Sequence, residues 1–162
     1  MSAVAVFTGQ GGVTGEVLFH ETKMGVTVHA KFSSLPHGDH GFHIHKAGDL
    51  RGEGCKGACD HFHIGRNCRH GGSPSHGGER HTGDLGNITG PTCSKRYVLH
   101  SVRMYDLYGR SIIVHEDPDD FGKGVFEDSP TTGHSGKRIA CAIIGRVSDT
   151  CTNTTRKQRT HL

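Results

Sequence analysis

The chain has 162 residues, enough for one domain with a buried core, and its formal charge of +3 is spread along the sequence with no basic block, which gives nucleic-acid binding no support. Only 32% of the residues are apolar, and 25 glycines stand beside seven phenylalanines and no tryptophan, so we expect many turns and long loops. Fifteen histidines, almost as many as the 16 carboxylates, are the first indication of metal chemistry.

The chain starts with a short β-type run at residues 3–8, which carries no positive leader and no long apolar stretch. No segment approaches the ~20 consecutive apolar residues that a bilayer requires. We therefore expect no signal peptide, no membrane segment and a cytoplasmic location. Six cysteines fit that location poorly, because reducing compartments disfavour disulfides; either some are free or one bond is well shielded.

Short runs with period-two alternation follow, separated by turns rich in glycine. In residues 26–32, two valines, one alanine and one phenylalanine alternate with polar side chains, which is the pattern of a strand with one solvent-exposed face. The predicted strands lie at residues 3–8, 16–20, 26–32, 41–45, 85–89, 97–102, 111–115 and 139–144. The last is apolar on both faces and should be buried. No segment has a helical apolar period, so we predict an all-β Greek-key sandwich or barrel.

Two long segments interrupt the strands, at residues 48–84 and 116–138. The first has almost no apolar periodicity but many histidines, and such long irregular segments are usually functional. We interpret it as a loop ordered by metal. Residues 1–147 are predicted to form one domain, and residues 148–162 a disordered polar tail.

His43 and His45 stand one residue apart in a predicted strand, where side chains two residues apart share a face. Three imidazoles with one carboxylate would suit structural zinc, whereas imidazoles alone favour copper(II). The other candidate ligands are His61, His70, His81, Asp84 and His115. Seven ligands fill two four-coordinate sites only if one is shared, and an imidazole that has lost both protons can bridge two metals.

The remaining histidines are weaker candidates, because a lone histidine is more often a surface or packing residue than a ligand. We assign His20, His29, His37, His100 and His161 to the surface or to packing. His63, His76 and His134 lie near the long loops and stay open. A zinc-ribbon interpretation of Cys55, Cys59, Cys68 and His70 is conceivable, but its spacings fit poorly.

Five collinear motifs resemble those of the copper,zinc superoxide dismutase family: residues 41–45 (GFHIH), 70–72 (HGG), 79–87 (ERHTGDLGN), 114–116 (VHE) and 138–141 (RIAC). The likeness runs from about residue 3 to residue 147. It implies an eight-stranded Greek-key β-barrel with long zinc and electrostatic loops. It also implies an antioxidant enzyme that converts superoxide to oxygen and hydrogen peroxide through a copper redox cycle.

The resemblance also implies roles for individual residues. The copper ligands would be His43, His45, His61 and His115, and the zinc ligands His61, His70, His81 and Asp84, with His61 as the bridge and a proton donor. Asp119 would link a copper histidine to a zinc histidine, Arg138 would receive the anion, and Cys55 would pair with Cys141. Glu127, Asp128, Thr132 and Lys123 would belong to the electrostatic loop.

The chain departs from the family pattern at several positions. Asp117 and Thr131 stand where lysines are common near the channel, so we expect weaker steering of the anion and a rate less sensitive to salt. Cys59 and Cys68 are either both free or joined in a second bond. Arg146 and Tyr108 stand at the family's apolar dimer contact, so we expect a homodimer with an altered interface, and a copper chaperone is a candidate partner.

Two other functions fit the same motifs. One is a non-catalytic metal-binding protein for copper delivery or storage, and delivery relatives keep the fold while losing copper ligands. The other is a catalytically inactive relative, which would lose Arg138 or a copper histidine. Every one of those residues is present, which favours the enzyme.

Overall fold

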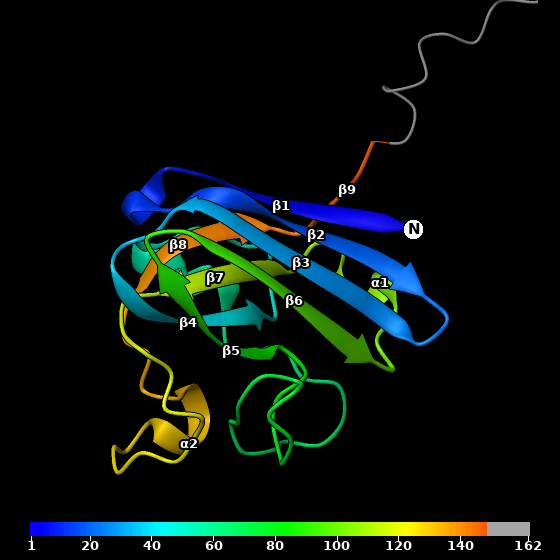
Figure 1. The fold of residues 1–162 in the computed structure, drawn as a ribbon. Coiled ribbons are helices and arrows are strands. Elements are labelled where there is room, and N and C mark those ends of the chain that lie inside the picture. The colour runs from blue at the N-terminus through cyan, green and yellow to red at the C-terminus, as the bar shows by residue number, and fades with distance from the viewer. Residues whose placement is uncertain (149–162) are drawn as a thin grey trace, which may run out of the picture.

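Two antiparallel β-sheets, packed on one shared core, form the fold in the computed structural model, which describes residues 1–148 (Figure 1). The five-stranded sheet has the order β6-β3-β2-β1-β9 and the four-stranded sheet the order β5-β4-β7-β8. The strands are β1 (Ser2–Thr8), β2 (Thr14–Thr22), β3 (Gly25–Ser34), β4 (Gly38–His45), β5 (Asp84–Gly90), β6 (Cys93–His100), β7 (Ser111–His115), β8 (Arg138–Ile143) and β9 (Gly145–Arg146).

This architecture confirms the predicted all-β class as a sandwich, while the two sheets do not close into a barrel. Four short helical elements were not predicted: the 3₁₀-helices η1 (Gln10–Gly12) and η2 (Glu53–Ala58) and the one-turn α-helices α1 (Met104–Leu107) and α2 (Ser129–Thr132). They are too short for a helical apolar period to be visible in the sequence.

None of the helices in the described part of the chain has the length and apolar character that crossing a bilayer requires.

Two strand predictions need correction. The strand expected at residues 97–102 is β6, which starts four residues earlier and ends at His100. Residues 139–144 were expected to be buried on both faces, but Ile143 is 48% exposed while Ala140, Ala142 and Ile144 are buried. Ile143 lies in β8, an edge strand of its sheet, so one face of its apolar run is open.

The core lies between the sheets and is built by alternate residues of each strand. Phe7, Phe32 and Phe42 come from three different strands and pack in a row, tilted and then edge-to-face, with ring centroids 5.4 and 5.7 Å apart. Burying each such side chain stabilises the fold by about 1.5–3 kcal/mol. Phe42 also defines which face of β4 points inward.

The opposite face of β4 carries the chemistry. Because Phe42 and Ile44 point into the core, His43 and His45 must point away from it, yet both are fully buried. The long loops of residues 46–83 and 116–137 cover them, and Figure 1 shows both loops on the side of the four-stranded sheet that faces away from β1, β2 and β3.

Two β-bulges turn further polar residues toward this loop-covered face. In β8, Val114 pairs with Ala140 but His115 pairs with Arg138, so Ile139 is the extra residue. In a regular strand that kept Ile139 in the ladder, Arg138 and Ala140 would lie two residues apart and share the core-facing side.

The second bulge lies in β5 and acts on Asp84. Gly41 pairs with Asn87 but His43 pairs with Asp84, so β5 carries one additional residue beside Phe42. Gly86 has φ +74°, a conformation that glycine adopts without strain. The bulge places Asp84 on the same face as His43 rather than on the core side.

Candidate metal centre

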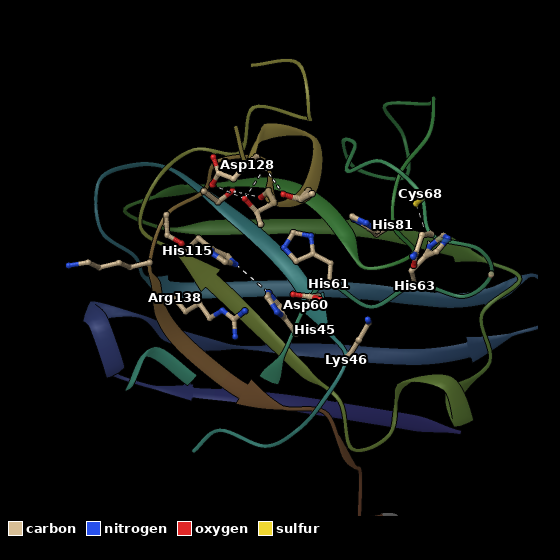
Figure 2. A pocket seen from close by; sticks show the side chains of 17 residues that line it. His45, Lys46, Asp60, His61, His63, Cys68, His81, His115, Asp128 and Arg138 are labelled. Atoms are coloured by element: carbon tan, nitrogen blue, oxygen red, sulfur yellow. Dashed lines mark hydrogen bonds between the residues drawn. The ribbon is translucent and has the colours of Figure 1, made fainter. Parts of the chain in front are cut away.

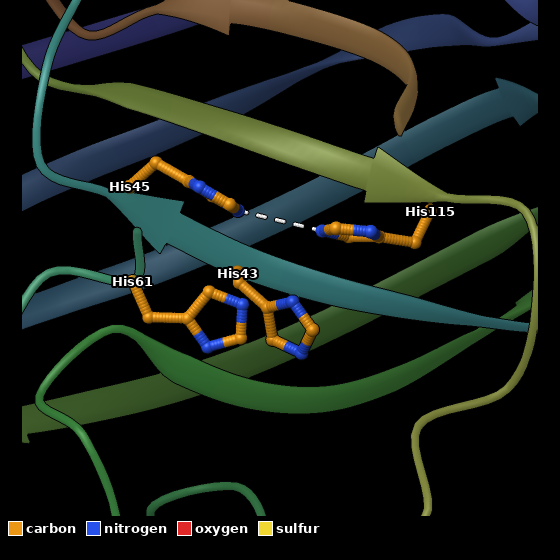
Figure 3. A group of neighbouring side chains, drawn as sticks. All are labelled: His43, His45, His61 and His115. Atoms are coloured by element: carbon orange, nitrogen blue, oxygen red, sulfur yellow. Dashed lines mark hydrogen bonds between the residues drawn. The ribbon is translucent and has the colours of Figure 1, made fainter. Parts of the chain in front are cut away.

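Four histidines from three parts of the chain converge beneath the loops (Figure 3). His43 and His45 come from β4, His115 from the end of β7, and His61 from the first long loop, where its backbone pairs with His45. One nitrogen from each lies within 4.8 Å of the others, and all four side chains are buried. We call this group the histidine cluster.

The hydrogen bonds of this cluster fix which nitrogens carry protons. His45 Nδ1 donates to the carbonyl oxygen of Cys59 (2.8 Å), and His115 Nδ1 donates to that of Gly136 (3.1 Å). In the neutral rings both Nε2 atoms are then unprotonated, although they lie 3.4 Å apart. Two lone pairs that face each other at this distance are arranged for a cation.

The other two members each present an unpaired nitrogen. His43 Nε2 donates to Asp119 Oδ2 (2.6 Å), which leaves His43 Nδ1 as an acceptor. His43 Nδ1 and His61 Nε2 are both buried and have no hydrogen-bond partner within residues 1–148. An unsatisfied buried nitrogen costs about 1–3 kcal/mol, so both atoms fit a metal ion as their partner.

A second group shares His61 with the first and contains His61, His70, His81 and Asp84; we call it the mixed cluster. Asp84 Oδ1 lies 2.9 Å from His61 Nδ1, 3.1 Å from His70 Nδ1 and 3.2 Å from His81 Nδ1. Backbone N–H groups of Gly71 and His81 donate to Asp84 Oδ2, which keeps Oδ1 free to face the nitrogens. One carboxylate oxygen and three imidazoles form a closed tetrahedral donor set.

Asp119 connects the two clusters. Its carboxylate accepts from His43 Nε2 (2.6 Å) and from His70 Nε2 (2.8 Å), so it fixes the orientation of one ring in each cluster. Asn87 holds the backbone of Asp119 through two hydrogen bonds. Gly133 lies so close that a Cβ atom there would collide with both the carboxylate and the His70 ring.

Burial determines the protonation of the histidine cluster. It lowers the pKa of His43 and of His45 well below the ordinary value, and the neighbouring imidazoles lower both further. Burial likewise lowers the pKa of His61, and that of His115 to about 3. The four rings are therefore neutral at physiological pH, and each has a lone pair available to bind a metal ion.

The mixed cluster has the opposite electrostatic character. Burial would lower the pKa of His70, but its hydrogen bonds with Asp119 and Asp84 outweigh this effect and raise the pKa to about 9. Burial alone would raise the pKa of Asp84, but hydrogen bonds from His61, His70 and His81 hold it far below its usual range. The carboxylates make this cluster attractive to a cation even when its rings are neutral.

An open cavity of about 1060 Å³ leads to the histidine cluster (Figure 2). Its walls include His45, His61 and His115 together with the Arg138 side chain. Arg138 donates from Nη1 to the Cys55 carbonyl (2.8 Å) and from Nη2 to the Cys59 carbonyl (2.6 Å). Since arginine stays protonated at neutral pH, the cavity carries a fixed positive charge beside the cluster.

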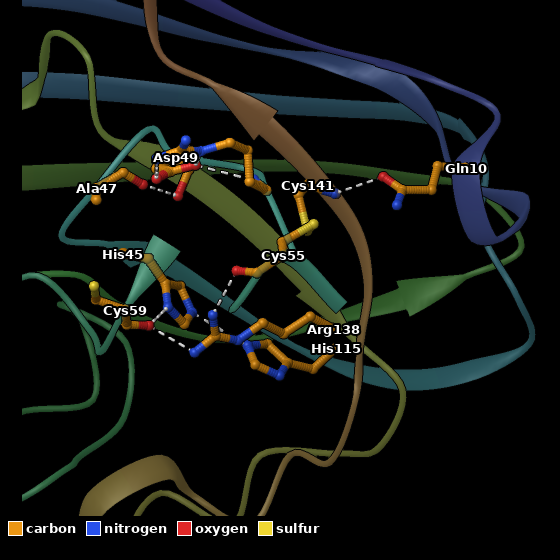
Figure 4. The surroundings of a disulfide bond; sticks show 11 residues. Gln10, His45, Ala47, Asp49, Cys55, Cys59, His115, Arg138 and Cys141 are labelled. Carbon is orange, nitrogen blue, oxygen red and sulfur yellow. Dashed lines mark hydrogen bonds and ion pairs between the residues drawn. A yellow bond between two sulfur atoms is a disulfide. The ribbon is translucent and has the colours of Figure 1, made fainter. Parts of the chain in front are cut away.

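The disulfide Cys55–Cys141 joins the first loop to β8 close to Arg138 (Figure 4). This is the predicted pairing. It fixes the backbone segment whose carbonyls orient both Arg138 and His45. Cys59, Cys68 and Cys93 are free, so Cys59 and Cys68 form no second bond, and Cys151 lies outside the described residues.

The predicted electrostatic-loop residues do not all lie together. Asp128 and Thr132 line the cavity, whereas Lys123 and Glu127 do not. Lys123 Nζ lies 3.1 Å from His76 Nε2 instead. His63 also lines the cavity. The histidines of the described residues that were assigned to the surface or to packing lie outside both clusters: His20, His29, His37 and His100.

Some supporting residues were missed from the sequence. His40 is 4% exposed, with Nδ1 2.9 Å from the His115 carbonyl and Nε2 3.0 Å from the Pro36 carbonyl, so it ties β4 to the end of β7. Asn87 and the carbonyls of Cys59 and Gly136 were also missed. Among these residues, only Asn87 could have been noticed from the local sequence, because it is a polar residue within a predicted strand.

Sequence comparison places this arrangement among known proteins. The profile of the copper/zinc superoxide dismutase (SODC) family matches residues 13–144. The chain belongs to the copper/zinc superoxide dismutase family. Copper and zinc are therefore its cofactors, and the dismutation of superoxide is its reaction.

Curated relatives of the family cover nearly the whole chain. Superoxide dismutase (Cu-Zn) A of Xenopus laevis is 41% identical over 151 residues, covering 90% of this chain and 97% of the relative. A Cu-Zn superoxide dismutase of Paramecium bursaria Chlorella virus 1 is 42% identical, covering 90% of this chain and 78% of the relative. Cu-Zn superoxide dismutase 3 of Arabidopsis thaliana is 40% identical, covering 90% of each chain.

Proposed function

We propose that the histidine cluster holds copper and the mixed cluster holds zinc, with His61 shared between them. A donor set of neutral imidazoles suits copper, and a closed set with one carboxylate suits structural zinc. The bridge requires both nitrogens of His61. Nδ1 faces Asp84 and Nε2 is the unpartnered atom on the copper side.

The observation that carries this proposal is the set of acceptor nitrogens left by the surrounding hydrogen bonds. Acceptors on Cys59, Gly136 and Asp119 take the proton-bearing nitrogens of three rings, and Asp84 takes that of His61. Each nitrogen aimed at the centre therefore presents a lone pair. Uncharged lone pairs buried together would repel each other, and a bound cation removes that repulsion.

When bound, copper supplies one-electron chemistry by alternating between +2 and +1, and zinc supplies a positive charge that cannot be reduced. The balanced reaction takes two superoxide anions and two protons to one oxygen and one hydrogen peroxide. Arg138 would hold the anion at the cavity wall beside His61 and His115. While its Nε2 is not a metal ligand, His61 would hold a proton there and release it to the departing peroxide.

Metal analysis and a superoxide assay on the same preparation test this proposal. We expect one copper and one zinc per chain and rapid superoxide removal. His115→Ala should lose copper and fall to the background rate while it retains zinc; the control is His100→Ala, on the exposed face of β6. Wild-type protein that binds both metals and leaves superoxide untouched would contradict the enzyme and favour a metal-binding protein.

The assembly and location are also proposals. We propose a homodimer with an altered contact, because Ile143 is 48% exposed and Arg146, three residues later, holds its guanidinium 5.2 Å from the Tyr108 ring. Light scattering would measure the mass, and Arg146→Ile should strengthen the dimer.

A copper chaperone as partner and a cytoplasmic location remain parts of the same proposal, and residues 1–147 would form the catalytic domain. The predicted tail, apart from Ser148, lies outside the described residues.

A further inference from the structure

The wall of the cavity carries a negative charge where an anion must pass. Asp128 lines the cavity with Thr131 and Thr132, on the same loop that leads to Arg138. Its carboxylate is about half exposed, so it faces solvent rather than a buried partner. An uncompensated carboxylate at this point would repel superoxide.

One histidine is arranged to compensate this charge. His134 Nδ1 lies 2.6 Å from Asp128 Oδ1, while Thr132 Oγ1 donates to Asp128 Oδ2 (2.9 Å). This contact lowers the pKa of the Asp128 carboxyl. His134 does not itself line the cavity, so it acts on the cavity through the carboxylate.

The imidazole is fixed in place by its surroundings. The ring of Phe126 stacks on that of His134 with centroids 3.6 Å apart and an interplanar angle of 8°. His134 adopts φ +53°, a left-handed backbone conformation that is uncommon and strained for residues other than glycine. Its N–H donates to Thr132 Oγ1 (3.3 Å), which ties the strained backbone to the same carboxylate network.

We propose that His134 is a positioning residue for the incoming anion, holding Asp128 in place and neutralising it so that the cavity wall stays attractive to superoxide. This inference rests on the proposed function, because it takes the cavity as the path of superoxide to the histidine cluster. It assigns a role to a side chain outside the metal centre and beyond the direct contacts of Arg138.

The contact joins an imidazole to a carboxylate, so pH is the experimental variable that tests it. Histidine is the side chain whose ordinary charge change falls between about pH 5 and 8. Asp128 is the acidic group within ion-pair distance of His134 among residues 1–148, and the nearest other charged side chains along the loop are Glu127 and Lys137. A histidine–carboxylate pair that loses a proton becomes more negative by one unit, so anion entry past such a pair should slow with rising pH.

Kinetics of the metal-loaded protein at two salt concentrations test the inference. At about 0.01 M ionic strength the Debye length is about 30 Å, and at 1 M about 3 Å. His134→Gln should lower the superoxide rate constant, measured by pulse radiolysis, about two- to fivefold at pH 6 and low salt. The loss should shrink at pH 8.5 and vanish at 1 M salt. His134→Lys should keep the pH 6 rate up to pH 8.5.

A matched control and a second readout separate charge from folding. His76→Gln alters another loop histidine that packs on a phenylalanine, Phe121, but faces Lys123 rather than a carboxylate, so it should leave the pH and salt profiles unchanged. Azide is an anion that does not react further, and its dissociation constant with the copper-loaded protein, read by absorbance, should rise in His134→Gln in parallel with the rate loss.

Three outcomes would overturn the inference: His134→Gln with wild-type rates at pH 6 and low salt, a deficit that persists at 1 M salt, or azide affinity that does not change. A wild-type protein without superoxide removal would instead defeat the proposed function. Active wild-type protein with unaltered His134→Gln defeats this inference alone.

Discussion

The histidine cluster and the mixed cluster share the His61 ring but differ in the charge of their donors. In the first, burial lowers the pKa of every ring; in the second, hydrogen bonds with Asp119 and Asp84 raise the pKa of His70 to about 9. One shared imidazole therefore joins a donor set of neutral rings to a donor set that contains a carboxylate. The histidine cluster suits a metal ion that changes its oxidation state, and the mixed cluster suits a metal ion that keeps its charge.

The pH stability of the metal-free protein should show this contrast most strongly. The lowered pKa values of the histidine cluster mean that the unfolded chain binds more protons, so stability is lost as pH falls from about 6.5 toward 3, by about 1.4 kcal/mol per pH unit for each ring that stays neutral. The raised pKa of His70 acts in the other sense: its contribution is complete below about 6.5 and is lost as pH rises toward 9.

Urea unfolding across pH measures both limbs. Metal-loaded protein should have a flatter profile, because bound ions keep the nitrogens unprotonated. Parallel profiles with and without metals would show that the clusters do not control stability.

Asp84→Asn should break the mixed cluster alone. The change removes a fully buried charge that three imidazoles face, and removing one partner of a buried pair costs about 3–5 kcal/mol. We expect loss of zinc with retention of copper, measured by metal analysis and by unfolding of the metal-free protein. Asp39→Asn, at an exposed position of β4, is the control; equal losses of copper and zinc would argue against two separable sites.

Removal of the disulfide should act on the histidine-cluster side. The variant Cys55→Ala with Cys141→Ala should lose about 2–4 kcal/mol of unfolding free energy. Superoxide removal should fall more than zinc content, because the freed segment carries the carbonyl partners of Arg138 and His45. Cys93→Ala, which removes a free and half-buried thiol, serves for comparison. An unchanged rate in the double variant would show that the loop needs no covalent tie.

Asp119→Asn should weaken both clusters at once. Groups that orient metal-binding histidines typically contribute 10–100-fold in affinity, so we expect losses of about that size for copper and for zinc. Competition with a chelator measures both affinities, and Asp120→Asn provides a neighbouring carboxylate that does not touch either ring. A loss confined to one metal would mean that Asp119 supports only one cluster.

Much of the site could be predicted because its residues come in local patterns. His43 and His45 share a face through strand alternation alone, and His81 and Asp84 lie within one turn. Other features depend on contacts between distant segments. Nothing in the sequence near His40 indicates that the carbonyls of His115 and Pro36 would surround it, and the exposure of Ile143 depends on which strand forms the edge of its sheet.

The bulges beside Phe42 and at Ile139 were equally invisible, and they have a practical consequence for engineering. Redesigning β8 or β5 to pair as a regular ladder with every residue retained would give a more regular sandwich. Each redesign would turn one essential polar group by half a turn, Arg138 in β8 and Asp84 in β5, from the loop-covered face into the hydrophobic core. A redesign that optimised only the regularity of the strands would thus keep the two sheets and remove Arg138 or Asp84 from the active site.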